Sequence, residues 1–211
     1  MGSPASISAL RTRMMPLLAI LRHDLRTLWA SWLVRLWLAG AAVLTLLLVA
    51  SNWALFQTAP LVAALLFPFL VFPWFLVVIV LGVTPVSGSR AEALADGILS
   101  RPVTRWEYLV ASWAARVVTV LGVFLAVIVP AVLIVALARR PVEEDAVTLY
   151  GILASLAVVG LVLTFLVSLG FLLGTLLRGP LLAVVVLVFV WYPISLILNI
   201  YSLEESSPSS P

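Results

Sequence analysis

Few side chains in this chain of 211 residues could do chemistry. There is no cysteine, and the one histidine, His23, lies next to Asp24 in the sequence. A metal site needs several histidine, cysteine or carboxylate ligands, and a serine–histidine intramembrane protease needs a histidine inside the helical bundle. Asp24 alone beside His23 is no cluster of ligands, and His23 lies outside the predicted bundle of spans, so we expect no catalytic residue, no metal and no cofactor.

Lysine is also absent, because all twelve cationic side chains are arginines. Phosphate-binding loops of the Gly-x-x-x-x-Gly-Lys type require a lysine that reaches the nucleotide phosphates. The chain cannot bind ATP in this way, and we expect that it is not an enzyme. If it uses nucleotide energy, a separate ATPase subunit must supply that energy.

Charged side chains that could meet such a partner gather in residues 87–109, between two long apolar runs. Ser89 and Glu92 form a capping box, which predicts that a helix begins at the residue after the serine. Pro102 disfavours helical geometry at the residue before it, so this helix should cover about 90–99. A separately capped helix of about ten residues, roughly 15 Å long, is suited to docking on a partner protein.

A second capping box, Thr104 with Glu107, predicts a helix that continues into the next apolar run. Arg116 lies within that helix, and an arginine at the middle of a bilayer costs about 2.5–3.5 kcal/mol on insertion scales. We therefore expect Arg116 at the cytoplasmic boundary, with residues 105–115 projecting inward as a helical stalk. Its side chain either snorkels to the interface or is a functional ion-pair partner.

The composition indicates that the bilayer surrounds most of the chain. It is 64% hydrophobic and 10% charged, with a mean hydropathy of +1.25. About 20 apolar residues cover the hydrocarbon core, and five runs are long enough to cross it. We expect an all-α transmembrane bundle that forms a single domain over residues 1–211. The predicted spans are about 33–51, 60–83, 108–138, 147–177 and 180–201.

Arginine placement predicts the orientation. With the N-terminus in the cytoplasm, ten arginines fall on the cytoplasmic side and only Arg139 and Arg140 fall outside. The tail 203–211 would then be extracytoplasmic and disordered. The sequence pI near 10.0 does not indicate nucleic-acid binding, because the arginines lie at the ends of the spans.

Before the first span, an amphipathic helix is expected over about 16–31, lying in the cytoplasmic interface. Its charged side chains, Asp24 among them, lie mostly opposite its apolar face. The residues of that apolar face are Leu18, Leu21, Leu25, Leu28, Trp29 and Trp32.

Gly170 and Gly174 form a Gly-x-x-x-Gly face in the fourth apolar run, and we expect them to pack helices closely. Scattered polar residues such as Thr119, Thr164 and Ser168, together with aromatic residues away from the interfaces, fit an amphipathic cargo better than an ion. Helix packing explains the same residues, so we assign no substrate site.

The order of these elements resembles the type-2 ABC export permease family. The segment Leu99–Glu107 is similar to the family's Leu-Ser-x-Pro-Val-Ser/Thr-Arg motif, which follows its coupling helix. Leu21–Arg26 resembles the family's Arg-x-Glu-Leu-Arg motif, with Asp24 in place of the acid. Ala111–Ser112 stand where a Gly-Lys pair is usual, and members usually have six spans, whereas five are predicted here.

The resemblance implies a permease subunit of an exporter in a bacterial or archaeal cytoplasmic membrane. Its expected partners are an ABC ATPase subunit, a second permease subunit in a homo- or heterodimer, and membrane lipid. The expected ATPase-docking residues are Arg90, Ala91, Glu92, Leu94, Asp96, Ile98, Arg101 and Arg105. Two alternatives remain: residues 87–107 are an ordinary cytoplasmic loop with a surface helix, or the chain is a non-transporting or truncated accessory membrane protein.

Overall fold

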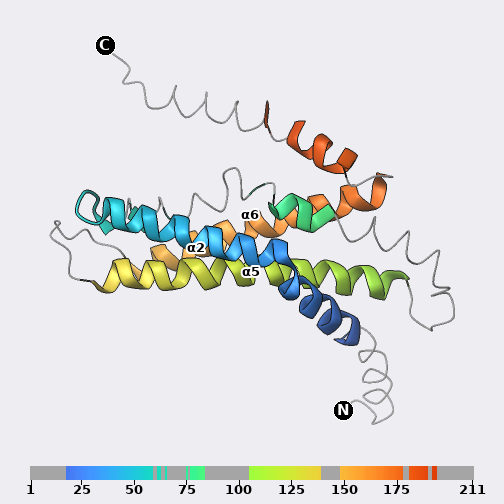
Figure 1. The fold of residues 1–211 in the computed structure, drawn as a ribbon, viewed down its shortest axis with the longest axis horizontal. Coiled ribbons are helices and arrows are strands. Elements are labelled where there is room, and N and C mark those ends of the chain that lie inside the picture. The colour runs from blue at the N-terminus through green and yellow to red at the C-terminus, as the bar shows by residue number, and fades with distance from the viewer. Residues whose placement is uncertain are drawn as a thin grey trace, which may run out of the picture.

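The fold is described from a computed structural model. The structure describes residues 18–58, 61–62, 65, 75, 77–83, 105–138, 148–177, 181–189 and 192–193. Within these ranges every regular element is a helix, and no residue lies in a strand (Figure 1). The long helices are α2 (Trp32–Asn52), α5 (Arg105–Leu137) and α6 (Leu149–Leu176). The all-α class predicted from the sequence is confirmed for this part of the chain.

All three long helices are long and apolar enough to cross a membrane, so the chain is a multi-pass membrane protein. They coincide with the predicted spans 33–51, 108–138 and 147–177. The other two predicted spans, 60–83 and 180–201, fall on stretches that the structure describes only in pieces. In those pieces the described residues are helical.

Side-chain caps fix where two of these helices begin. Ser31 precedes α2, and its Oγ accepts a hydrogen bond from the backbone N–H of Val34 at 3.3 Å. Thr148 precedes α6, and its Oγ1 accepts from the N–H of Gly151 at 3.1 Å. Each cap satisfies a backbone donor that has no partner within its own helix.

Helix α5 is the longest of the three, with 33 residues, and it runs through Pro130. At 1.5 Å per residue it measures about 50 Å. The hydrocarbon core is roughly 30 Å thick, so α5 must tilt or extend beyond the core. The predicted stalk 105–115 forms the first three turns of this single helix.

Helix α5 contacts both α2 and α6. Figure 1 shows α2 and α5 running in the same direction, with α6 antiparallel to them. The N-terminal end of α5 and the C-terminal end of α6 therefore lie at the same end of the bundle. The short helical stretch 77–83, drawn in green, lies beside that end of α6.

The core between these helices is apolar and closely packed. Its largest fully buried side chains on the three long helices are Trp37, Phe124, Ile128, Leu163 and Leu166. The outward faces are apolar as well. Leu47, Ile134 and Leu161 are each more than half exposed in the isolated chain. Contact of such faces with lipid is favourable, whereas their exposure to water would cost free energy.

Before α2, residues 18–30 form a helix that ends where Ser31 interrupts it. This N-terminal helix crosses α5 (Figure 1). The two come close at Gly122 of α5, where an added Cβ would lie 3.1 Å from the Trp29 ring. The N-terminal helix is therefore packed on the bundle along part of its length.

Candidate functional site

Three polar side chains meet where the N-terminal helix crosses the first part of α5. The Ser112 hydroxyl donates a hydrogen bond to Asp24 Oδ2 at 2.9 Å. Arg116 Nη1 donates to Ser112 Oγ at 2.7 Å and also to the Ser112 carbonyl oxygen. The same Nη1 lies 4.0 Å from Asp24 Oδ2. We call Asp24, Ser112 and Arg116 the polar cluster.

Helical spacing brings these three residues together. Ser112 and Arg116 are four residues apart, so they lie on the same face of α5, and both are buried. Asp24 shares the half-buried side of the N-terminal helix with Leu21, Leu25 and Leu28. The sequence interpretation, which grouped Asp24 with charges opposite the apolar face, is corrected here: Asp24 lies on the side that faces the bundle.

Arg116 is enclosed by protein, with its side chain only 5% exposed. Its guanidinium carbon lies 5.9 Å from the centroid of the Phe171 ring on α6, within the range of a cation–π contact. Its Nε has no hydrogen-bond partner among the described residues. Of the two alternatives for Arg116, the geometry favours the ion-pair partner over a side chain that snorkels to the interface.

A second polar contact joins α5 to α6 beside the cluster. Trp113 Nε1 donates to Ser168 Oγ at 3.0 Å, and the Ser168 hydroxyl donates to the Thr164 carbonyl oxygen at 2.7 Å. Trp113 lies next to Ser112 in the sequence, so one turn of α5 is hydrogen-bonded to two different helices. The first part of α5 is thus fixed on both sides.

The predicted packing glycines lie at the same end of the bundle, on α6. An added Cβ on Gly174 would lie 2.9 Å from the Val83 carbonyl oxygen, and one on Gly170 would lie 3.4 Å from the Ile79 carbonyl oxygen. Both glycines are buried. The backbone of 79–83 therefore approaches α6 more closely than a larger residue at Gly174 would allow.

Most of the predicted docking residues lie outside the described residues. These are Arg90, Ala91, Glu92, Leu94, Asp96, Ile98 and Arg101, together with the predicted caps Ser89 and Thr104. Helix α5 begins at Arg105, the residue after Thr104, and Glu107 lies in its first turn. The sequence predictions for the docking segment stay predictions.

Sequence reasoning missed the polar cluster itself. Asp24 and Arg116 were each singled out but never paired, and Ser112 was noted only as a departure from a family motif. The available signal was a serine four residues before an arginine in an otherwise apolar helix, a spacing that favours a shared face. The third member, Asp24, lies on another helix, and no pattern in the sequence around it indicates that it meets Ser112 and Arg116.

The cluster joins two helices through charged and polar side chains. Its serine has no histidine beside it, and none of the described residues form a group of three or more histidine, cysteine or acidic side chains that could hold a metal ion. A carboxylate, a hydroxyl and a guanidinium in mostly apolar surroundings attract each other strongly, because the local dielectric constant is low. Such a contact can hold the N-terminal helix at one position on α5.

Comparisons with known proteins return no relative. No protein-family model, no curated protein and no solved structure matches this chain.

Proposed function

We propose that the chain is the transmembrane subunit of an ABC transporter, an exporter whose ATP is hydrolysed by a separate subunit. In this proposal it crosses the membrane five times, with its N-terminus in the cytoplasm and its C-terminus outside. It pairs with a second permease subunit, which is either a second copy or a related chain. The ATPase docks on the predicted helix 90–99.

The observation that supports this proposal most is the continuity of α5. It runs unbroken from Arg105 to Leu137, and it begins directly after the Pro-Val-Thr part of the family-like motif. A force applied to residues 90–104 would therefore act on one end of a membrane-capable helix of about 50 Å.

The contacts of α5 extend that argument to the neighbouring helices. Ser112 and Arg116 bind the N-terminal helix through Asp24, and Trp113 binds α6. Movement of the first turns of α5 would be transmitted to both neighbours, because packed helices and hydrogen-bonded contacts shift as units. A permease driven from its cytoplasmic side needs such a connection.

Co-purification tests the proposal. The intact chain, solubilised in a mild detergent, should recover a stoichiometric ATPase that carries a lysine-containing phosphate-binding loop. Leu94→Asp together with Ile98→Asp should abolish the recovery, because both positions lie on the apolar stripe predicted to enter the ATPase. Ala93→Asp together with Gly97→Asp is the matched control, since it adds the same two charges, also four residues apart, outside the apolar stripe of the predicted helix.

Two results would contradict the proposal. One is recovery of the intact chain without any ATPase. The other is equal recovery of the ATPase by both double variants, which would show that the predicted stripe does not dock it.

The proposed topology has its own test. A reporter that is active only outside the cytoplasm should be active when fused after Pro211, because an odd number of spans places the two termini on opposite sides. The same reporter fused after residue 88 should be inactive. Activity at residue 88 or inactivity at Pro211 would mean that the number of spans or the orientation is wrong.

A further inference from the structure

The outward side of the N-terminal helix is positively charged. Arg22 and Arg26 are exposed on it beside His23, and Arg35 is exposed one turn into α2. The only acidic residue between 18 and 35 is Asp24, and its carboxylate is turned toward α5. The polar cluster thus holds the one acidic side chain of residues 18–35 on α5, on the opposite side of the helix from Arg22 and Arg26.

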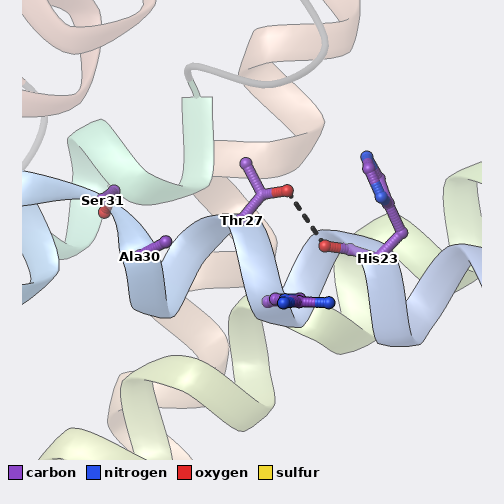
Figure 2. A pocket seen from close by; sticks show the side chains of 5 residues that line it. His23, Thr27, Ala30 and Ser31 are labelled. Carbon is purple, nitrogen blue, oxygen red and sulfur yellow. Dashed lines mark hydrogen bonds between the residues drawn. The ribbon is translucent and has the colours of Figure 1, made fainter.

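A shallow hollow of about 560 Å³ lies on this positive side, with His23 and Thr27 beside it (Figure 2). The hydroxyl protons there are already used: Thr27 Oγ1 donates to the His23 carbonyl oxygen at 3.0 Å, and Ser31 Oγ donates to the Leu28 carbonyl oxygen at 2.6 Å. The full lining is His23, Arg26, Thr27, Ala30 and Ser31. The donors left for a ligand are therefore those of Arg26 and His23, which suit an anion.

Exposed apolar side chains follow the hollow along the chain. Trp32, the residue after Ser31, is 74% exposed, and an exposed stripe of Leu36, Val43 and Leu47 continues along α2. Tryptophan is enriched where the hydrocarbon core meets the headgroups. The hollow thus lies beside the start of a membrane-capable helix, and the exposed Trp32 predicts that this start lies at the level of the headgroups.

We propose that this hollow binds the headgroup of an anionic phospholipid in the leaflet where α2 begins. The guanidinium group of Arg26, which lines the hollow, binds the phosphate oxygens, since the planar fork of arginine matches phosphate geometry. The exposed Arg22, four residues earlier on the same helix, adds positive charge beside it. The acyl chains lie along the exposed stripe of α2. Charge complementarity and the adjoining apolar stripe together select a lipid over a free anion. The proposal needs only a membrane protein and does not depend on an ATPase partner.

Native mass spectrometry of the purified full chain in detergent tests the proposal with dioleoyl phosphatidylglycerol as the probe. Each basic residue near an anionic surface contributes about a fivefold preference, so Arg22→Gln with Arg26→Gln should raise the first dissociation constant on the order of 25-fold. Dioleoyl phosphatidylcholine, whose choline group offsets the charge of its phosphate, should bind the intact chain more weakly and lose less affinity in the variant. Arg139→Gln with Arg140→Gln is the matched control, because it removes the same charge at the other predicted end of the protein.

Four outcomes would overturn the proposal. The first is equal phosphatidylglycerol affinity in the intact chain and in the Arg22/Arg26 variant. The second is an equal loss in the control variant, which would make net charge the cause. The third is displacement of the lipid by inorganic phosphate at the same concentration, which would identify a free-anion site. The fourth is an Arg22/Arg26 variant that keeps its lipid but no longer recovers the ATPase, which would make this side a protein interface.

Discussion

At the end of the bundle that holds the polar cluster, two helix contacts are built in different ways. The N-terminal helix is held on α5 by Asp24, Ser112 and Arg116, over donor–acceptor distances of 2.7 and 2.9 Å. The stretch 79–83 is held on α6 by glycines that let the backbones approach each other. The first contact depends on which side chains meet, and the second depends on how closely two helices can lie.

The difference has a physical consequence in lipid. A charged contact enclosed by apolar side chains is costly to separate, because each partner then lacks its counter-charge in a medium of low dielectric constant. A glycine contact rests on dispersion, which weakens gradually with distance and specifies no partner atom. We infer that the polar cluster fixes the position of the N-terminal helix, whereas the glycine contact permits small sliding movements of α6.

One residue connects the two contacts. Phe171 lies between Gly170 and Gly174 in the sequence of α6, and its ring lies under the Arg116 guanidinium. The same turn of α6 therefore touches both the polar cluster and the stretch 79–83. Breaking each contact separately should show whether they differ as argued.

The largest effect is expected from Asp24→Leu. It leaves Arg116 buried beside Ser112 with no carboxylate among its described contacts. Removing one partner of a buried ion pair typically costs about 3–5 kcal/mol. Asp24 itself is 20% exposed, so the loss should lie at the lower end of that range. The free energy of unfolding, measured by titration with sodium dodecyl sulfate in mixed micelles, gives the value.

Two further variants separate charge from size in this experiment. Asp24→Leu combined with Arg116→Met should regain most of the lost stability, because replacing both partners of a buried pair by apolar residues is often neutral. Arg22→Met, which removes an exposed arginine from the other side of the helix, should leave stability nearly unchanged. A double variant as unstable as Asp24→Leu alone would mean that the ion pair does not hold this contact.

The polar cluster and the glycine contact differ in how far the sequence predicts them. The long helices α2 and α6 end within two residues of the predicted spans, because an apolar run of that length has one stable form in lipid. The glycine pair could be singled out, since its spacing of four lies within one helix and marks one face. The partner stretch 79–83 contains Gly82, where an added Cβ would lie 3.1 Å from the Val167 carbonyl oxygen, but a single glycine does not mark a helix face as a spaced pair does.

The polar cluster could not be predicted, since it depends on the angle at which the N-terminal helix crosses α5. Ser31 interrupts the helix before α2, and that break lets residues 18–30 turn toward Ser112 instead of continuing along the axis of α2. The periodicity of the apolar residues also predicted only approximately where Asp24 lies around the N-terminal helix. The face that contains Leu21, Leu25 and Leu28 is wide enough to include it.

A smaller effect is expected from Gly174→Ala, for which Gly160→Ala is the matched control on the same helix. The new Cβ at position 174 would lie 2.9 Å from the Val83 carbonyl oxygen, so the helices must move apart. The new Cβ at position 160 would lie 3.5 Å from Leu121 Cδ2, which is an ordinary contact. Overpacking typically costs about 1–3 kcal/mol. Alanine gains up to about 1 kcal/mol over glycine in a helix.

Gly160→Ala should therefore be neutral or slightly stabilising in the same micelle titration, and Gly174→Ala should be the less stable of the two. Equal stability of the two variants would mean that the stretch 79–83 yields easily, and that close approach at Gly174 does not hold α6 in place.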